Sequence, residues 1–522
     1  MQESMTKTAA VCVGSLLFNL IFWHEKQGFN VLIFDLFIGF AFFYFNAAAF
    51  KMRSVQAVAA GTLISALLII LHNSLIVKVI HLFSFTFFVG LVQHSELRFL
   101  GSAFLIYVSN WVKTPKNLLE SLKILPILRG PERINKSLNN AMLSILIVPL
   151  FFLIYYTANP KFAELSNVTF NHLWRWFSFD VNPLRLLFFM LGIFIVGAAI
   201  FQLNMGKTST LEANLSDNLA DANALNSAEE WTTERAADLQ DRYKNALNLI
   251  VTLNILLLIN NFLDIQNVWL DNGVLLSATD LKQFVHEGTY VLIFGIALAI
   301  SVTLILFRGI LNFVKNAQIL RGSAYLWLAQ NAVLAVSVGM RNWRYIDAYG
   351  LAYKRIGVFI FLLLVLIGLN FIYLKIKEKR TFFFFMNRSA WAIYGVLLLA
   401  CFVNWDVFIT HYNLTATPKS GTIDARFLLH DVSEKNLKTL IEYRSELLKK
   451  MPNRPFSNGD LREYGSSEYD LPTFPNESEK AEFIDKRIYE KRRNFESEQS
   501  TLSWLSWNYA DAQNAAYLTT QK

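Results

Sequence analysis

Apolar residues fall in long runs over the first three quarters of the chain, and polar segments separate these runs. A helix needs about 20 apolar residues to cross the hydrocarbon core of a bilayer. Lipid offers no partner to open backbone groups, so each run predicts a transmembrane helix. About twelve spans are predicted, over residues 8–23, 29–46, 55–71, 75–93, 98–112, 138–157, 184–203, 244–263, 288–307, 323–340, 356–374 and 389–403.

The pattern changes after the last run. Residues 431–450 place apolar side chains at helical spacing among charged ones, which predicts an amphipathic helix. Residues 451–475 contain four prolines and two glycines and predict a linker. Residues 477–510 alternate charge on a helical period before reaching Trp504, Trp507 and Tyr509, a face suited to another helix or to a membrane interface.

This pattern predicts two domains in an all-α protein. Residues 1–403 form a polytopic transmembrane helical bundle, interrupted by a polar loop at 204–242. Residues 404–522 form a small, mainly helical extramembrane domain.

Composition supports the same class of protein. Hydrophobic residues make up 54% of the 522 residues and charged residues only 17%, against about 25% in an average soluble domain. A disordered chain, a collagen-like chain, a disulfide scaffold and a purely soluble enzyme do not fit these values. The two cysteines, Cys12 and Cys401, lie inside apolar runs and predict neither a disulfide framework nor a metal site.

The distribution of charge predicts the orientation of the chain. The net charge is +8, yet the tail from Asn404 holds 16 basic and 18 acidic residues, so the basic excess lies in the loops of the bundle. The basic loops 113–137, 308–322 and 375–388 should face the cytoplasm, and parity then places the C-terminal domain outside it. The basic stretch 341–355 opposes this assignment, and a re-entrant 323–340 would reverse the orientation after it.

A few ionisable residues within or beside the predicted spans are candidates for proton transfer or catalysis. Asp35 lies inside an apolar run, where a carboxyl group is costly; it is either a proton or ion relay or a group near one end of the span that reaches water. His286 and Glu287 open the span at 288–307, and Asp264 precedes the acidic loop. Either group of residues can supply a base to a membrane enzyme.

Known catalytic and metal-binding patterns are missing from the sequence. It contains no HExxH, no glycine-rich phosphate loop, no G-x-S-x-G and no histidine cluster with ligand spacing. We therefore expect no cofactor and no metal, and a function that leans away from catalysis. Basic clusters with interleaved aromatics on a soluble segment are also missing, which argues against nucleic-acid binding.

The densest constellation of polar and aromatic residues lies between the spans at 288–307 and 356–374. Its candidate binding residues are Arg308, Asn331, Arg341, Arg344, Tyr349, Lys354 and Arg355. The cations either grip lipid phosphates or another anionic ligand, with aromatic rings beside them, or they anchor the helices at the headgroup level without specificity.

This constellation also carries a family resemblance. The residues involved are Phe307-Arg308-Gly309, Asn312-Phe313, Trp327, Gln330-Asn331, Arg341-Asn342, Tyr345, Tyr349-Gly350-Leu351, Tyr353-Lys354-Arg355 and Gly357, followed by Asn404-Trp405-Asp406, Ile409 and Tyr412-Asn413. The pattern resembles a bacterial multi-pass membrane family catalogued only as a domain of unknown function, of the four-one-five-three and four-one-seven-three types. The resemblance is good over about residues 240–445, weak before them, and does not reach the tail beyond about 450.

The resemblance implies a polytopic helical protein of a bacterial cytoplasmic membrane and no particular reaction. Two positions depart from the family pattern, where Ala352 replaces a usual Thr and His411 replaces a frequent Arg.

Three functions remain open at this point. The first is a non-enzymatic signalling, regulatory or scaffold protein, with membrane lipids and a protein bound to the C-terminal domain as its partners. The second is a transporter or flippase-like protein lined by Asp35, Asp264, Glu287 and Arg341. The third is a membrane enzyme that acts on a lipid-linked substrate.

Overall fold

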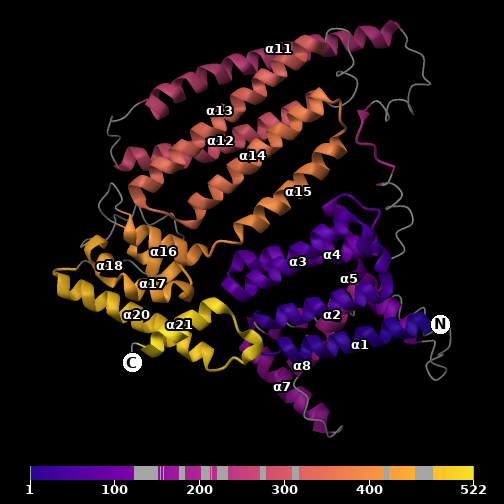
Figure 1. The fold of residues 1–522 in the computed structure, drawn as a ribbon, viewed down its shortest axis with the longest axis vertical. Coiled ribbons are helices and arrows are strands. Elements are labelled where there is room, and N and C mark those ends of the chain that lie inside the picture. The colour runs from indigo at the N-terminus through magenta and orange to yellow at the C-terminus, as the bar shows by residue number, and fades with distance from the viewer. Residues whose placement is uncertain are drawn as a thin grey trace. The chain divides into compact units, whose positions relative to one another are not determined.

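The computed structural model describes residues 2–122, 148, 151–152, 155–156, 158–175, 183–201, 212, 214–219, 233–270, 278–307, 317–416, 423–452 and 474–520. In these ranges all the regular secondary structure is helical, apart from one isolated β-bridge between Asn218 and Arg380. It divides into two compact units (Figure 1). Unit 1 comprises Met1–Ala213 and Thr501–Ala512, and unit 2 comprises Asn214–Ser500 and Gln513–Lys522.

The described helices of unit 1 are mostly apolar. They are α1 (Gln2–Phe22), α2 (Phe29–Asn46), α3 (Arg53–His72), α4 (Leu75–Gln93), α5 (Leu100–Leu122), α7 (Pro160–Arg175) and α8 (Pro183–Ile200). Asn73 ends α3 in a left-handed conformation with φ 49°, which lets the chain turn at once into α4. Gly90 of α4 lies against the backbone of Ala103 in α5, so a side chain there would clash. Small residues of this kind let membrane helices approach closely.

The segment Thr501–Ala512 belongs to unit 1 because it binds the loop between α1 and α2. The Glu25 carboxylate accepts a hydrogen bond from the Ser506 hydroxyl at 2.5 Å and from the Ser503 N–H at 3.2 Å. Gly28 lies against the backbone of Ser506, where a Cβ would clash. The ring of Trp504 lies 6.0 Å from that of Phe29, while most of the indole stays exposed.

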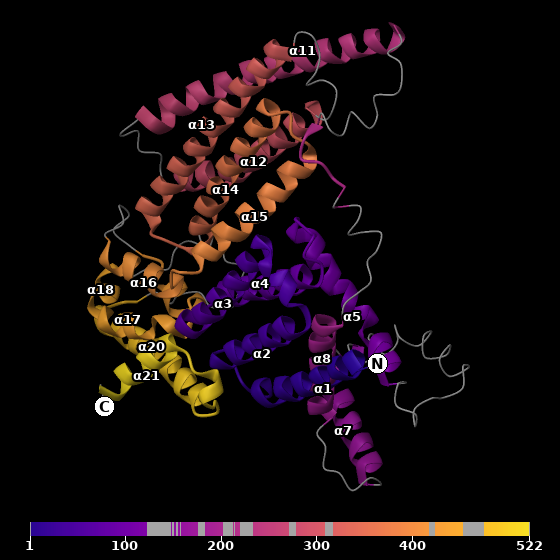
Figure 2. The same cartoon turned by 45° about the vertical axis from the view of Figure 1, so that its right-hand side comes forward.

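Unit 2 begins with five long helices that lie side by side (Figures 1 and 2). They are α11 (Thr233–Asp264), continued by the π-helical segment η3 (Ile265–Leu270), then α12 (Ala278–Leu306), α13 (Ala317–Tyr349), α14 (Tyr353–Lys377) and α15 (Phe382–Ala400). The short helices that follow form a cap: α16 (Trp405–Thr415), η5 (Phe427–Asp431), η6 (Glu434–Asn436), α17 (Leu437–Glu442), α18 (Arg444–Lys450) and α20 (Glu477–Gln499). The last helix, α21 (Tyr509–Thr520), starts in unit 1 and ends in unit 2.

Eight of the described helices are long and apolar enough to cross a membrane, which is the pattern of a multi-pass membrane protein. They cover Glu3–Phe22, Phe29–Lys51, Arg53–His72, Leu75–Gln93, Gln240–Leu270, Gln318–Tyr349, Tyr353–Lys377 and Phe382–Ala400. Two shorter apolar helices, Leu184–Ile200 and Val291–Leu306, fall on two further predicted spans. The span predicted at 98–112 falls on α5. Most residues of the span predicted at 138–157 and of the polar loop 204–242 lie outside the described residues. The all-α fold is confirmed, and the count of about twelve spans stays a prediction.

The structure differs from the sequence pattern around the basic–aromatic stretch. The predicted span 323–340 is part of one continuous helix of 33 residues, α13, which runs through the cations as far as Tyr349. Only Gly350, Leu351 and Ala352 separate it from α14. Residues 341–349 are therefore helical rather than a loop, because the helix ends only where glycine permits a left-handed turn.

The cap has its own apolar core, which includes the end of α13. Ile346 and Leu351 from the α13–α14 turn pack with Ile409 of α16, Leu440 of α17 and Ile484 of α20. Burying these side chains together is what holds the short helices in place, since helices of six or seven residues are not stable alone. The predicted helix at 431–450 is broken at Tyr443 into α17 and α18, and residues 453–473 of the predicted linker lie outside the described residues.

Two buried lysines fasten α20 to the rest of the cap. Lys480 donates a hydrogen bond to the Met451 carbonyl at 3.1 Å, and Lys491 donates one to the Val432 carbonyl at 2.7 Å. Burial lowers the pKa of Lys491 to about 8, and the nearby acidic groups, Glu434 first among them, oppose that shift. Both lysines thus carry polar contacts into an otherwise apolar interface.

Candidate functional site

The turn between α13 and α14 is the best-defined polar site of unit 2. Gly350 has φ 83°, a left-handed conformation that favours glycine, and its N–H binds the Ile346 carbonyl at 2.7 Å to close the last turn of α13. A Cβ at position 350 would lie 2.5 Å from Oδ1 of Asn413. Both the backbone conformation and the close contact therefore require glycine here.

Asn413 of α16 holds the next residue of the turn with both ends of its amide. Its Oδ1 accepts the N–H of Leu351 at 2.6 Å, and its Nδ2 donates to the carbonyl of Leu351 at 2.8 Å. Leu351 and Asn413 are both buried, so neither backbone group has to rely on water. We call this contact, together with the Asp406 contacts described next, the turn–cap joint.

Asp406 forms the second half of the turn–cap joint. Its carboxylate accepts a hydrogen bond from the Tyr353 hydroxyl of α14 at 2.5 Å and another from the Ser433 hydroxyl of the cap. Asp406 stands in the first turn of α16, where exposed backbone N–H groups favour a negative charge. One carboxylate thus links a transmembrane helix to two parts of the cap.

Arg355 closes the same turn from the α14 side. Its guanidinium lies over the ring of Tyr345, 4.4 Å from the centroid. The same group donates to the Tyr349 carbonyl at 3.2 Å and to the Gly350 carbonyl. Because these are the last carbonyl of α13 and the one directly after it, Arg355 caps the helix and stacks on its aromatic face.

A buried ion pair lies inside the bundle between α11 and α13. Arg341 binds the Asp264 carboxylate, which also accepts a hydrogen bond from the Ser337 hydroxyl at 2.8 Å. The indole N–H of Trp269 reaches Ser337 at 3.3 Å. Two opposite charges at this depth compensate each other, which is how membrane bundles usually tolerate them.

Amides continue this polar seam along both helices. Asn254 donates to the Ser323 carbonyl at 3.0 Å and accepts from Gln330 at 2.8 Å, and Asn261 donates to the Gln330 carbonyl at 3.0 Å. Steps of seven residues separate Asn254 from Asn261 and Ser323 from Gln330. Later residues of α11 contact later residues of α13, so the two helices run parallel and are joined by interhelical hydrogen bonds.

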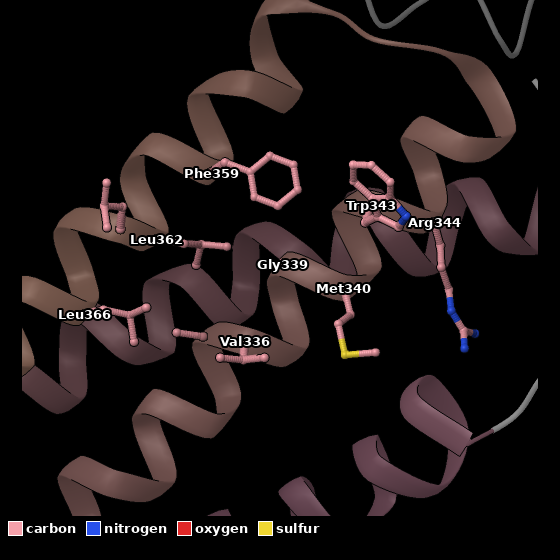
Figure 3. A pocket seen from close by; sticks show the side chains of 10 residues that line it. Val336, Gly339, Met340, Trp343, Arg344, Phe359, Leu362 and Leu366 are labelled. Carbon is pink, nitrogen blue, oxygen red and sulfur yellow. The ribbon is translucent and has the colours of Figure 1, made fainter. Parts of the chain in front are cut away.

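An apolar groove of about 520 Å³ opens on the face of α13 and α14 (Figure 3). Leu362 and Leu366 of α14 and Val336 and Gly339 of α13 form its floor and walls. Trp343 and Phe359 lie at one end of the groove, with Met340 and Arg344 on the α13 side, as Figure 3 shows. The only charged residue in its lining is Arg344.

The structure separates the predicted site residues into several groups. Arg341 and Asp264 bind each other, Arg355 and Tyr349 belong to the end of α13, and Asn331 donates to the Trp327 carbonyl of its own helix at 2.8 Å. Of the predicted cations in the described range, Arg344 borders the groove and Lys354 is exposed on the first turn of α14.

The remaining candidates lie elsewhere or cannot be placed. Asp35 belongs to unit 1. Arg308 and the side chains of His286 and Glu287 lie outside the described part of the structure. The sequence pattern did not single out Ser337, although its spacing of seven from Gln330 and of fourteen from Ser323 places it on the same helical face.

Eight candidate spans, four in each unit, and the helical cap that follows those of unit 2 define this chain as a multi-pass membrane protein. Residues 13–443 match a family described as a domain of unknown function, DUF4153, and the chain belongs to this family. The matched range contains both sides of the turn–cap joint and ends before α18. The family predicted from the sequence is thereby confirmed. Neither the curated proteins nor the solved structures contain a match.

Proposed function

We propose that the protein is a non-enzymatic signalling, regulatory or scaffold component of a bacterial cytoplasmic membrane, in which the cap follows the state of the α13–α14 helix pair. The turn–cap joint is the observation that supports this proposal. Asn413 and Asp406 bind the three-residue turn and the start of α14 through hydrogen bonds that are buried or partly buried. A shift of either helix along its axis must therefore move α16 or break these bonds.

The use of the buried charges favours this role over catalysis. A membrane enzyme needs an acid or base and a cationic group that both face a shared pocket. Asp264 and Arg341 instead bind each other between α11 and α13, with Ser337 as a third partner. Their arrangement serves the packing of the bundle.

The cap offers a surface for a protein partner, which we propose to lie on the extracytoplasmic side. The outward face of α20 exposes Tyr489 among the charged residues Glu482, Asp485 and Arg493. An exposed aromatic ring within a charged surface is typical of protein interfaces.

Site-specific photo-crosslinking in native membranes tests the proposal. A photoreactive residue is placed at Glu482, Tyr489 or Arg493 on α20, and the matched control is placed at Leu399, an exposed apolar position of α15. We expect a discrete protein adduct from the α20 positions and only lipid adducts from Leu399. Absence of protein adducts from all three α20 positions would contradict a scaffold or signalling role for the cap.

The groove supports a second candidate, a flippase-like protein or another protein that handles lipids. Its apolar lining suits an acyl chain, and Arg344 beside Trp343 suits a phosphate at the headgroup level. Native mass spectrometry after purification in mild detergent tests this reading. We expect retained anionic phospholipid that Arg344→Gln reduces several-fold and that Arg321→Gln, outside the groove lining, leaves unchanged. Equal retention in both variants would remove this candidate.

A further inference from the structure

Three polar residues meet inside unit 1, each from a different helix. Asp35 of α2 is 4% exposed, His81 of α4 is 8% exposed, and Ser65 of α3 is fully buried. The Asp35 Oδ2 lies 3.7 Å from His81 Nε2, and the Ser65 hydroxyl lies 3.0 Å from His81 Nδ1. The imidazole therefore stands between a carboxyl group and a hydroxyl group, with a different ring nitrogen toward each.

The hydrogen atoms available to these groups limit the possible states. Ser65 has a single hydroxyl hydrogen, and the Thr62 carbonyl accepts it at 2.9 Å. When Ser65 donates to Thr62, His81 has to donate from Nδ1 to the Ser65 oxygen. The Nε2 atom of a neutral imidazole is then a bare acceptor that faces the acceptor atoms of Asp35.

Two acceptors that face each other need a proton between them. Neither carboxylate oxygen of Asp35 has a hydrogen-bond partner in the part of the chain that the structure describes. A bare carboxylate in apolar surroundings is energetically costly because no hydrogen-bond donor or water solvates its charge. One proton, either on Nε2 or on the carboxyl group, removes this cost because the pair then carries no net charge.

We infer that Asp35 and His81 form a proton-binding site inside the α2–α3–α4 bundle, with Ser65 as the residue that positions the imidazole. In the proton-bound state, Ser65 donates to Thr62 and His81 donates from Nδ1. In the proton-free state, Ser65 turns its hydroxyl toward Nδ1, Nε2 keeps the remaining hydrogen, and the carboxylate keeps its negative charge. The two states differ by one proton and by the direction of one hydroxyl group.

Few other charges can compensate the proton-free state. Asp35 is the only charged residue of α2, and α4 adds only Lys78, one turn before His81. Most other charged or titratable groups of the elements packed against α2 stand near helix ends or in loops: Glu3 and Lys7 of α1, Lys51 of the 3-10 turn η1 (Ala47–Lys51), Arg53 and His72 of α3, Arg185 of α8, and Glu25 beside the 3-10 turn η8 (Trp504–Ser506). Cys12 of α1 lies farther from a helix end, and α5, which packs against α4, adds Tyr107, Lys113 and Lys116. Loss of the proton therefore leaves a buried negative charge, which favours entry of water or separation of α2 from α4.

Infrared and ¹⁵N-histidine NMR spectra of the full chain in lipid nanodiscs test the site directly. Infrared difference spectra between wild type and Asp35→Asn show whether Asp35 is a protonated carboxyl group. The signal of His81, one of eight histidines, is identified by its loss in His81→Gln. Near neutral pH we expect either a protonated Asp35 band or a His81 ring with hydrogens on both nitrogens.

The variants add a readout that a purely structural role would not change. Asp35→Asn should leave His81 neutral with its hydrogen on Nδ1, and Ser65→Ala should shift the Nδ1 signal while circular dichroism stays helical. Where Asp35→Asn or His81→Gln does not fold, Asp35→Glu and His81→Asn assign the same wild-type signals. An ionised Asp35 beside a neutral His81 throughout about pH 5 to 8, the range in which histidine ordinarily titrates, would overturn the inference.

Discussion

Asn413 satisfies both backbone polar groups of Leu351, a residue 62 positions earlier in the chain. The amide side chain thus supplies Leu351 with the donor and the acceptor that a neighbouring backbone segment would otherwise provide. The turn at Gly350–Ala352 has no regular secondary structure, so its backbone depends on the cap for these bonds. Transmembrane bundle and cap are therefore not independent within unit 2.

Loss of the Asn413 amide should destabilise the cap. Asn413→Ala leaves the N–H and the carbonyl of Leu351 buried without a partner, at a cost of about 1–3 kcal/mol for each group. We expect a lower midpoint of thermal unfolding in detergent, followed by tryptophan fluorescence, and faster proteolysis of the cap. The matched control is Asn494→Ala on the exposed face of α20, which should leave both unchanged. Equal effects of the two substitutions would contradict the turn–cap joint.

Two glycines seven residues apart, Gly350 and Gly357, should respond oppositely to substitution by alanine. Gly350→Ala forces a left-handed conformation on alanine, at about 1–2 kcal/mol, and brings its Cβ against Asn413. Gly357→Ala, inside α14 with nothing within 4 Å of the added Cβ, should stabilise the helix by up to about 1 kcal/mol. Thermal unfolding of the two variants measures the contrast. A stabilising Gly350→Ala would show that the turn does not have the described conformation.

Removing one member of the Asp264–Arg341 pair should destabilise the protein strongly, whereas replacing both members by apolar residues should destabilise it little. Asp264→Leu or Arg341→Met alone leaves one buried charge without compensation, at about 3–5 kcal/mol. The double variant Asp264→Leu/Arg341→Met removes both charges and should recover most of the stability. A double-mutant cycle of unfolding midpoints measures the coupling. Additive losses would mean that the two residues do not interact.

Lys491 should make the stability of the cap depend on pH. Its pKa is lowered to about 8 in the folded cap, whereas an unfolded lysine has a pKa of about 10.4. Below pH 8 both states carry the proton, and the folded state bears the cost of the buried charge. Between about pH 8 and 10 only the unfolded state binds the proton, so the free energy of unfolding rises with pH, by at most about 1.4 kcal/mol per unit.

The difference in unfolding free energy between wild type and Lys491→Met isolates this contribution. The unfolding free energy of wild type minus that of Lys491→Met should increase from about pH 8 to about pH 10. Lys486→Met, on the exposed side of the same helix, provides the control and should show no such trend. A flat difference for Lys491→Met would mean that Lys491 is not buried as described.

Much of the fold follows from local pattern. Apolar runs of 19 or 20 residues, such as Arg53–His72 and Leu75–Gln93, are long enough to span lipid, so their helices can be read from the sequence. The helix α20 starts at Glu477, as its charge pattern predicts, because Asn476 caps it by accepting the N–H of Glu479. Length and periodicity are sufficient for such elements.

The contacts of the candidate site depend on residues far apart in the chain. Arg341 fits an anion-binding role equally well in the sequence, and only the position of α11 reveals Asp264 as its partner. Asp35 and His81 belong to different apolar runs, and no periodicity relates one run to another. The family resemblance identified Asn413 and Tyr349-Gly350-Leu351 as a pattern, but the hydrogen bonds between them require the packed cap.

Hydrogen exchange of two reciprocal variants tests the coupling of bundle and cap most directly. Coupling between two sites has the same magnitude in both directions. Asn413→Ala, a change in the cap, should increase amide exchange at residues 346–355 of the turn, and Gly350→Ala, a change in the turn, should increase it at residues 405–415 of α16. Exchange that rises only on the mutated side in both variants would contradict the account.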